Sequence, residues 1–238
     1  MTIEFLTQRL SRFVDLTSHE REAVAEWGER PLSVCAKQDV TRAGEPSNEI
    51  CVILQGWACQ SVDNQAGERQ IVRILLPGDI ANMRAVLLDA SDNNVMTFTD
   101  ASVALISKGR FLTTLDRFPR IREALWYSAL VDEGIAKQWI VSLGRRDARK
   151  KIAVFFCEQW VRGDMVGLVH NERLELPLTQ KDIGDIVGLT SVHVNRSLKA
   201  LREADMLRTP RVLTRLQVAR MAQMADFDLT YLQLARRR

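Results

Sequence analysis

Residues 178–207 read LTQKDIGDIVGLTSVHVNRSLKALREADML, and this stretch decides the fold of the C-terminal part of the chain. Thr179 suits a helix N-cap, and Asp182 places an acid in the first turn that follows. Gly188 is the residue type that most often ends a helix. Thr190 offers a second N-cap directly afterwards. The stretch therefore predicts two helices, the second over 191–203, joined by a very short turn.

Two helices joined by so short a turn cross steeply, and they pack closely only where the residues at the crossing are small. Gly184 lies where the second helix approaches the first. Four apolar residues are placed to fill the shared core: Ile183, Val187, Leu189 and Val194. Ser197 is the one exception in this pattern, because its position is expected to hold an aliphatic residue and holds a polar one instead. The pattern favours a helix-turn-helix over a generic helical hairpin.

The second helix presents a polar face away from that core. In the major groove, an Arg can bind O6 and N7 of guanine, and an Asn can bind N6 and N7 of adenine. We therefore predict Arg196 and Asn195 as base readers, with His193 and Val192 beside them. The residues better placed to contact phosphates are Thr179, Gln180, Thr190, Ser191, Lys199, Arg202 and Arg211. Each alone could belong to a solvated helix face, but together they converge on one exposed side.

Short elements are predicted on both sides of the helix-turn-helix. A helix over 149–160 and two strand-like runs, VGLVH and RLELP, precede it. After it, residues 206–208 and 212–214 are predicted to pair as a two-stranded wing with Arg211 at the tip. A last helix is expected over 216–224, before a tail that ends in three arginines.

The charge of the chain is distributed unevenly around a net value of +3. Residues 1–144 contain 15 Lys and Arg against 19 Asp and Glu, a net charge of −4. Residues 145–238 contain 18 against 11, a net charge of +7. A basic C-terminal part suggests contact with a polyanion, most often nucleic acid, and the plain alternative is a basic solvated surface.

The N-terminal part is rich in β-forming residues. Thr17 and Glu20 have the spacing of a capping box and predict a short helix there. From residue 32 to 107, turn signals separate the runs ICVILQG, WACQSV, RQIVRILLPGD, VMTFTD and SVALIS. One short helix over 83–88 could interrupt this pattern. Short strands at regular spacing predict a small antiparallel barrel or sandwich.

One long helix is predicted over 119–143. Its apolar residues fall at steps of three or four in one stripe: Ala124, Tyr127, Val131, Ile135, Trp139 and Leu143. A second apolar set lies off that stripe: Leu125, Trp126, Leu130 and Ile140. Two apolar faces suggest that one covers the β-rich domain and the other meets a second copy of the chain. We assign the first stripe to dimerisation, and the alternative is a helix that lies only on its own domain.

The end of this helix is the predicted domain boundary, where the charge balance also changes sign. Gly144 suits a C-terminal cap and Asp147 an N-terminal cap. The chain is therefore divided into an N-terminal helix with a β-rich domain over 1–117, a dimerisation helix over 118–144 and a DNA-binding domain over 145–238.

Composition excludes several classes of protein. The chain has 238 residues, of which 46% are hydrophobic and 26% charged, which is unlike a disordered or fibrous chain. No run approaches the ~18 apolar residues of a membrane span, and the N-terminus lacks a signal-peptide pattern, so we expect a cytoplasmic protein. The four cysteines show no CxxC spacing: Cys35, Cys51, Cys59 and Cys157. We expect reduced, mostly buried thiols and no metal site.

The chain as a whole resembles the CRP/FNR superfamily of bacterial transcription regulators over roughly residues 10–215. The matching pieces are the turn at Gly44-Glu45, ICVILQG, the LLPGD turn, the long helix and DIGDIVGLTSVHVNRSLKALREADML. The resemblance implies an α+β fold: an antiparallel, cyclic-nucleotide-binding-like β-roll of the jelly-roll type, a dimerisation helix and a C-terminal winged helix-turn-helix. Arg196 falls on the family's base-reading arginine. The glutamate that often precedes it is replaced, with Val192 and His193 in that neighbourhood.

The β-roll departs from the family members whose ligands are best known. Cyclic-nucleotide binders carry a Glu soon after the Gly-Asp turn and an Arg-Ser pair further on, because a buried phosphodiester needs a cation. Here the two stretches read GDIANM and DNNVM. A weak effector pocket is assigned to Gly78, Asp79, Met83 and Arg84. We do not expect cAMP to bind, nor an iron-sulfur cluster, since no N-terminal cysteine cluster exists.

Haem remains an unsupported alternative, because His19, His170 and His193 lie outside the β-roll pattern. The sequence therefore predicts a homodimeric DNA-binding transcription regulator that responds to an effector other than cAMP. Its partners would be a palindromic double-stranded DNA operator, a second copy of the chain and, for an activator, RNA polymerase. The alternative is a constitutive DNA binder whose β-roll only supports dimerisation. An enzyme is not expected, because no nucleophile, base and orienting group are clustered in sequence.

Overall fold

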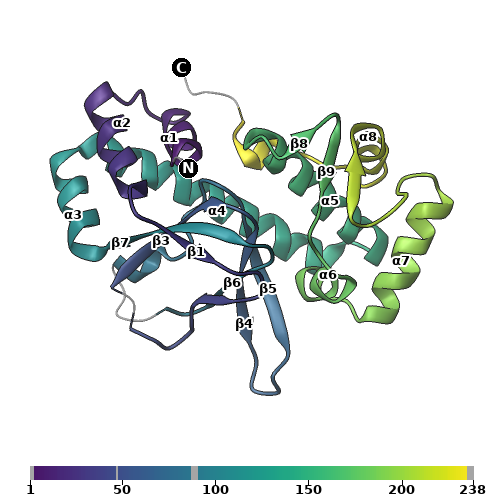
Figure 1. The fold of residues 1–238 in the computed structure, drawn as a ribbon. Helices are drawn as coiled ribbons and strands as arrows, with labels where there is room; N and C mark the ends of the chain where they lie inside the picture. The colour runs from purple at the N-terminus through teal and green to yellow at the C-terminus, as the bar shows by residue number, and fades with distance from the viewer. Residues whose placement is uncertain (1–2, 47, 87–90, 235–238) are drawn as a thin grey trace. The chain divides into compact units, whose positions relative to one another are not determined.

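The computed structural model describes residues 3–46, 48–86 and 91–234, with the side chains of residues 85 and 86 left aside (Figure 1). The described residues form two compact units, the first made of the residues up to Glu133 together with Leu234, and the second of Gly134–Gln233; the main division falls between Glu133 and Gly134. This point lies inside the long helix α4, Pro119–Arg145. The predicted dimerisation helix is therefore shared by both units. None of the described helices combines the length and apolarity needed to cross a bilayer.

The first unit is built on two antiparallel sheets, as predicted. One sheet has the order β1-β7-β3 and the other the order β2-β6-β4-β5. The strands are β1 Pro31–Val34, β2 Asp39–Thr41, β3 Glu49–Gln55, β4 Ala58–Asp63, β5 Arg69–Leu75, β6 Asn94–Thr97 and β7 Ala101–Ser107. In the β3–β7 pair, Val52 lies opposite Ala104. The five β-rich runs of the sequence are thus all strands, and β1 and β2 are additional short ones.

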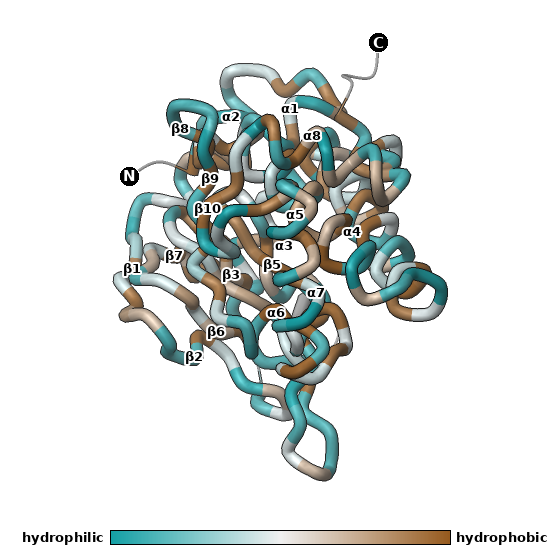
Figure 2. The backbone as a smooth tube through the Cα atoms, turned by 90° about the vertical axis from the view of Figure 1, so that its right-hand side faces the viewer, coloured by the Kyte–Doolittle hydropathy of each residue, from teal (hydrophilic) through white to brown (hydrophobic). Residues whose placement is uncertain are grey.

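The strands of this unit bury apolar residues on both faces. Five consecutive residues of β3, from Ile50 to Leu54, are buried, and they divide between two core clusters. One cluster lies under the N-terminal helices, and the other lies between the strands of the roll. The turn between β4 and β5, in contrast to these buried strands, is mostly hydrophilic and projects at the bottom of Figure 2. Hydrophobic burial therefore fixes the roll, and polar turns close its hairpins.

The helices of the first unit share a core cluster with β3 and β7. They are α1 Glu4–Ser11, α2 Ser18–Ala25, the 3-10 turn η1 Glu26–Gly28, the 3-10 turn η2 Met83–Val86 and α3 Lys108–Arg117. Thr17 and Glu20 form the predicted capping box at the start of α2. α1 was not predicted from the sequence, although Leu6 and Leu10 are fully buried. Of the short helix predicted over 83–88, residues 87 and 88 lie outside the described residues.

The end of α4 differs from the prediction. Gly144 lies inside the helix, which continues to Arg145, and a Cβ atom at Gly144 would meet open space. Gly144 is therefore not the expected left-handed C-terminal cap, because Arg145 can extend the helix by another residue. Asp147 does cap α5, Ala148–Met165, by accepting hydrogen bonds from the backbone N–H groups of Arg149 and Lys150.

The second unit contains α5, a small sheet and three further helices. The remaining elements are β8 Val169–His170, β9 Arg173–Glu175, α6 Gln180–Val187, α7 Ser191–Glu203, β10 Val212–Thr214, α8 Arg215–Met224 and the 3-10 turn η3 Thr230–Leu232. The sheet order is β10-β9-β8. The predicted pairing of residues 206–208 with 212–214 is wrong, because β10 pairs with β9 instead. An isolated bridge joins Thr209 to Val212. The wing is therefore the β9–β10 pair together with the turn over residues 209–211 that leads into β10.

Candidate DNA-binding site

The turn between α6 and α7 has the geometry of a helix-turn-helix. Gly188 ends α6 in the left-handed conformation, with φ +63°. The backbone N–H of Leu189 then donates a hydrogen bond of 3.1 Å to the carbonyl oxygen of Gly184. The left-handed conformation costs Gly little conformational free energy, because Gly has no Cβ atom that would clash with the backbone. The turn therefore needs Gly188 for its backbone angle and Gly184 for the close approach.

Threonines begin both helices of the motif. The hydroxyl of Thr179 accepts from the backbone N–H of Asp182, and the Asp182 carboxylate accepts from the backbone N–H of Thr179. Thr190 accepts from the backbone N–H of His193 at the start of α7. Each cap satisfies a backbone N–H that has no partner within its helix. The side chains predicted at Thr179 and Thr190 as phosphate contacts thus also serve as caps.

The core of the motif is apolar, with one small polar exception. The fully or almost fully buried members from α6 and α7 are Ile183, Ile186, Val187, Val194, Leu198 and Leu201. Ser197 is also buried, with 6% of its surface exposed. The position that we expected to be aliphatic is therefore internal, and a small hydroxyl side chain occupies it.

The predicted DNA contacts of α7 all lie on the exposed side of the helix. The exposed residues are Ser191, Val192, His193, Asn195, Arg196, Lys199 and Arg202. Thr179, Gln180 and Thr190 are exposed as well. Figure 1 shows α7 at the outer edge of the second unit, where its surface is open to a partner. The structure thus presents these side chains together, and their contacts with DNA remain a prediction.

Basic residues border this face on α7 and on the wing. Lys199 lies 3.7 Å from Glu203 in an exposed pair one helical turn apart, which leaves the ammonium group free to exchange partners. Arg211 is exposed at the turn before β10. Its backbone carbonyl accepts a hydrogen bond from the N–H of Leu176, which directly follows β9. The turn before β10 therefore presents the exposed Arg211 side chain from a backbone that is bonded to the neighbouring strand segment.

Three of the four residues of the predicted effector pocket lie beside α1 or its core cluster, and the fourth, Arg84, is exposed. A Cβ at Gly78 would meet the backbone of Phe5 in α1, and Asp79 forms an ion pair with Arg9 of the same helix. Met83 packs against the core cluster under the N-terminal helices. Arg84 is exposed and lies 3.0 Å from Asp92. The Gly78-Asp79 turn thus faces α1, and an effector pocket built from these four residues stays a prediction.

A network of ion pairs occupies this region of the first unit. Arg9 pairs with Asp79 and, at 2.7 Å, with Asp132. Arg73 of β5 pairs with the same Asp132 at 2.8 Å. Both arginine side chains are less than one fifth exposed. The network was not visible in the sequence, because its members are separated by up to 123 residues.

The described residues of the β-roll do not fit a cyclic nucleotide. The buried polar side chains are mostly neutral and bonded to the protein itself. Asn82 accepts from the N–H of Cys51, and Gln60 donates to the carbonyl of Ala81 and to Asn93. The half-buried arginines, Arg9 and Arg73, already face two carboxylates, Asp79 and Asp132. A phosphodiester anion brought into this interior would lack the cation that it needs.

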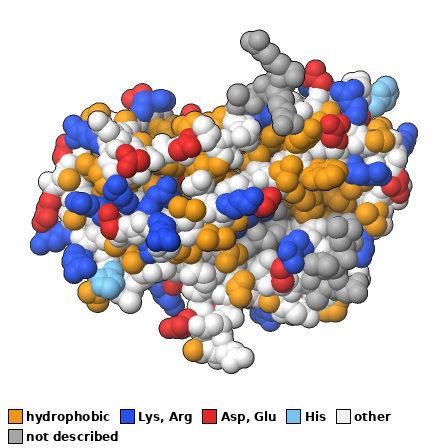
Figure 3. All heavy atoms as spheres, turned by 180° about the vertical axis from the view of Figure 1, so that it is seen from behind, with side chains coloured by type: hydrophobic (Ala, Val, Ile, Leu, Met, Phe, Trp, Pro, Cys, Tyr) orange, Lys and Arg blue, Asp and Glu red, His pale blue; other side chains and the backbone are white. Residues whose placement is uncertain are grey.

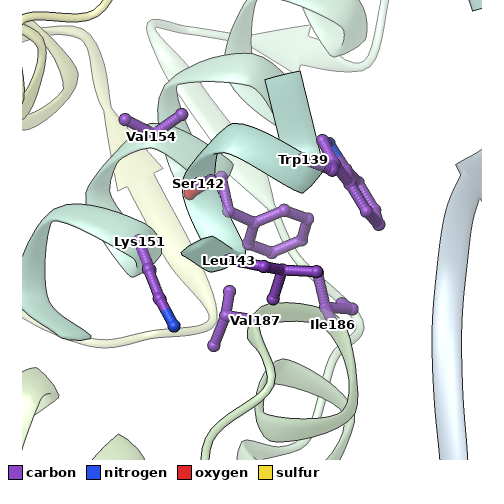
Figure 4. Close-up of a pocket in the computed structure, with 8 residues that line it drawn as sticks. Trp139, Ser142, Leu143, Lys151, Val154, Ile186 and Val187 are labelled. Carbon is purple, nitrogen blue, oxygen red and sulfur yellow. The ribbon is translucent and has the colours of Figure 1, made fainter. Parts of the chain in front are cut away.

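A small apolar cavity lies where α4, α5 and α6 meet in the second unit (Figure 4). It is lined by Trp139, Ser142, Leu143, Lys151, Val154, Phe155, Ile186 and Val187. Its volume of about 20 Å³ has room for about one water molecule. The cavity is therefore too small for a metabolite and is a packing gap beside the helix-turn-helix.

A buried carboxylate lies in the second unit at Glu158 of α5, which is 1% exposed. It accepts hydrogen bonds from Trp139 Nε1 of α4 at 3.1 Å and from the Tyr231 hydroxyl of η3 at 3.0 Å. Burial raises the pKa of Glu158, against the opposing effects of Arg162 and these hydrogen bonds. Burial and the Glu158 carboxylate raise the pKa of Tyr231, so Tyr231 stays a donor. The cluster joins three elements, and sequence spacing gave no sign of it.

The exposed apolar face of α4 is not the predicted dimerisation stripe. Ala124 and Ile135 of that stripe are buried within the chain, so their assignment to a dimer surface is wrong. Tyr127, Val131 and Trp139 are half-buried, and Leu143 is exposed. The second apolar set of α4 is more exposed to solvent than this stripe. Trp126, Leu130 and Ile140 are exposed, and Leu125 is its one buried member. Figure 3 shows hydrophobic side chains standing exposed among Lys and Arg on the face opposite to Figure 1.

No cluster of three His, Cys, Asp or Glu side chains suited to a metal ion occurs within the described ranges. The three histidines are exposed at His19, His170 and His193, on three different elements or turns. Three of the four thiols are buried, as expected, and Cys35 is exposed.

Two family models match the two units of this fold. Residues 31–118 match the cyclic nucleotide-binding domain, and residues 150–227 match the Crp-like helix-turn-helix domain. The transcriptional activator protein FnrL of Cereibacter sphaeroides is 28% identical over 170 residues, which are 70% of this chain and 68% of that protein. The nitrogen fixation regulation protein FixK of Azorhizobium caulinodans is 24% identical over 84% of this chain and 81% of its own length.

The fold is shared with a solved structure as well. The structure of FixK2 from Bradyrhizobium japonicum has a TM-score of 0.73 and 22% sequence identity, and the match covers 82% of this chain and 96% of that one. A domain of the cyclic nucleotide-binding type followed by a long helix and a Crp-like helix-turn-helix defines a class of DNA-binding transcription regulators, not of enzymes. The chain belongs to the CRP/FNR family.

Proposed function

We propose that this regulator acts as a homodimer that reads a DNA site with two-fold symmetry. The observation that carries the proposal is the common exposure of Arg196 and Asn195 on α7, with Lys199 and the wing residue Arg211 at the border. Arg196 and Asn195 would contact base edges together with His193 and Val192. The threonine caps, Gln180, Ser191, Lys199, Arg202 and Arg211 would hold phosphates and set the register.

The partner for dimerisation is a second copy of the chain, and α4 supplies the surface. Trp126, Leu130 and Ile140 leave an apolar face on a helix of 27 residues. An exposed apolar stripe of this length on a helix favours pairing with another helix. Two copies related by a two-fold axis would place two α7 helices in successive major grooves, about 34 Å apart. RNA polymerase would be a further partner if the regulator activates transcription, and a target in genomic DNA implies action in the cytoplasm.

We further propose that the β-roll responds to an effector other than cAMP. The support is the neutral, internally bonded polar interior and the pairing of Arg9 and Arg73 with Asp79 and Asp132. The same observation favours a second candidate function, a constitutive DNA binder whose β-roll serves only dimerisation. In the first case a signal would change how the two α4 helices meet, and the segment from Leu143 to Asp147 would pass the change to α7.

Selection of DNA by the full-length protein from random duplexes tests the DNA-binding proposal. The expected result is an enriched inverted repeat whose half-sites lie about one helical turn apart. A single half-site or a direct repeat would contradict the two-fold arrangement, and no enrichment would contradict sequence-specific binding.

Mass and absorption spectra of the freshly purified protein then test the effector proposal. A copurifying metabolite or chromophore whose removal changes DNA affinity would support a sensor. An apo-protein that already binds its site tightly, and that no added ligand stabilises, would favour the constitutive candidate. A change in DNA affinity on addition of cAMP would overturn the exclusion of cAMP.

A further inference from the structure

Val192 is an apolar side chain in the middle of a polar surface. It is 75% exposed, a larger fraction than any other large hydrophobic residue in the described part of the chain, with Trp126 next at 71%. A single exposed apolar side chain needs no explanation by itself. Val192, however, is the second residue of α7, between the cap Thr190 and the base-reading candidate Arg196. The start of a recognition helix is the part that reaches base edges.

The helix fixes the direction in which Val192 points. Val194 is fully buried in the core of the motif, so the residues two positions before and after it turn outward. Val192 and Arg196 are four residues apart and therefore lie on one face. Four residues advance a helix by about 6 Å, and successive base pairs are spaced by about 3.4 Å. The two side chains would thus reach base pairs one or two steps apart.

The chemistry of the major groove limits what Val192 can read. Base edges there present hydrogen-bond donors and acceptors, and the apolar feature is the methyl group on C5 of thymine. A valine offers neither donor nor acceptor. Against a polar edge it would remove water and return no hydrogen bond, which is unfavourable. Against a methyl group it would bury apolar surface on both sides.

We propose that Val192 reads the 5-methyl group of a pyrimidine, one or two base pairs from the guanine bound by Arg196. This inference rests on the proposed DNA-binding function and specifies its target. The methyl group can come from thymine or from 5-methylcytosine, which carries the same group at the same position. His193 and Asn195 lie beside the contact and are free to read the neighbouring polar edges, since both are exposed.

Single-atom changes in the selected operator test the contact with the full-length protein. Each thymine of one half-site is replaced in turn by deoxyuridine, which lacks only the methyl group. Each guanine is replaced by 7-deazaguanine, which lacks the N7 acceptor and so locates the base bound by Arg196. We expect one or two thymines near that guanine at which deoxyuridine weakens binding about fourfold, the effect of one buried methyl group. In the Val192→Ala protein the same replacement should change binding less than about 1.5-fold.

Two controls keep the test sharp. Val192→Thr keeps the branched shape and one methyl group, so it should retain part of the response to deoxyuridine. Replacing the sensitive T·A pair by 5-methylcytosine·guanine, and then by cytosine·guanine, separates the methyl group from the rest of the base pair. Tighter binding to the methylated pair by the wild type, and not by Val192→Ala, would extend the proposal to 5-methylcytosine. Equal binding would assign the contact to thymine in its own base pair.

Other outcomes overturn the proposal. If deoxyuridine is neutral everywhere in the half-site, or weakens wild type and Val192→Ala alike, Val192 does not read a methyl group, while DNA binding itself stands. If no sequence is selected at all, the proposed function fails and this inference fails with it. Because Val192 is so exposed, its replacement leaves the fold intact, and an unchanged melting temperature confirms this.

Discussion

Gly184 in α6 and Leu189 in the turn lie so close that a Cβ atom on Gly184 would be 2.6 Å from the carbonyl oxygen of Leu189. Real Cβ atoms do not approach a backbone oxygen so closely. The nearest side-chain atom, Val194 Cγ2, would be at an ordinary 3.5 Å. The constraint at Gly184 is therefore set by the backbone of the turn, more than by α7, and backbone cannot move aside as a flexible side chain can.

Gly184→Ala should destabilise the second unit by about 1 to 3 kcal/mol, the usual cost of forcing extra atoms into a packed site. It should also weaken specific DNA binding, because opening the turn rotates α7 away from the groove. Denaturant unfolding and operator titration measure the two effects.

Gly144→Ala is the matched control, since Gly144 is also helical but faces open space. At Gly144 no steric clash opposes the substitution, so the higher helix propensity of alanine should stabilise the protein by up to about 1 kcal/mol. Equal effects of the two substitutions would show that the close approach at Gly184 is not a constraint.

Arg196→Ala should cost about 1 to 3 kcal/mol of specific binding and relax the preference at one base position. Arg211→Ala on the wing should weaken binding to all sequences alike and reduce the salt dependence by about one counterion. Both arginines are exposed, so neither change should alter the melting temperature. Affinities for a panel of single-base operator variants at two salt concentrations separate the two roles. If Arg196→Ala leaves the base preferences unchanged, its assignment as a base reader is wrong.

Ile140→Asp, and separately Trp126→Asp, should dissociate the dimer. Each places a charge in an interface that we expect to be apolar, and an unpaired buried charge costs several kcal/mol. Sedimentation velocity over a range of protein concentrations gives the oligomeric state. Leu216→Asp on α8 is the control, because Leu216 is 63% exposed, close to the 68% of Ile140, but lies off α4. A dimer that survives both α4 substitutions would place the interface elsewhere.

Cys35 should be the first thiol to react with a thiol reagent in the native protein. It is exposed, whereas the other three are buried. Burial raises the pKa of Cys51 to about 12, and the pKa of Cys157 to about 12, so both remain thiols at neutral pH, and the thiolate is the reactive form. Mass spectrometry after brief labelling at pH 8 should find one modification, and four after denaturation. Rapid native labelling of Cys157 would contradict this prediction, because it would show that the buried thiol is accessible to the reagent.

The helix-turn-helix could be predicted almost completely from the sequence, because its information is local. Thr179, Gly188 and Thr190 act through neighbours within a few residues, and each capping or turn role is confirmed by the structure. The antiparallel β-roll followed in the same way from short apolar runs between polar turns. In both cases the residues that determine an element lie within that element or within a few residues of it, so the local sequence is enough to predict it.

The features that the sequence did not reveal depend on contacts between distant segments. Arg9 and Asp132 meet across 123 residues, and no local pattern marks them as partners. The apolar faces of α4 show the same limit. The sequence contains two apolar sets on this helix, and only the tertiary structure shows that Ala124 and Leu125, one from each set, are buried in the core of the first unit, whereas Trp126, Leu130 and Ile140 are exposed. The spacing of apolar residues along a helix shows how many apolar faces it has, but only tertiary contacts show which of these faces is exposed.

Glu158→Gln should change how the stability of the protein depends on pH. Because burial raises the pKa of Glu158, the folded protein holds a proton on it more tightly than the unfolded chain does. Below the unfolded pKa, about 4.3, both states are protonated and this contribution to stability is fully present. As the pH rises towards the folded pKa, the unfolded chain ionises first, and the contribution is lost at up to about 1.4 kcal/mol per pH unit.

The quantity to measure is the unfolding free energy of wild type minus that of Glu158→Gln, by denaturant titration from pH 4 to pH 8. It should fall as the pH rises, because glutamine has no proton to lose. Tyr231→Phe is the companion variant. It removes one hydrogen bond to the carboxylate and so raises the pKa of Glu158 further, which should extend the fall to higher pH and cost about 1 kcal/mol at neutral pH. A difference that stays flat, or rises with pH, would mean that the hydrogen bonds from Trp139 and Tyr231 outweigh burial at this site.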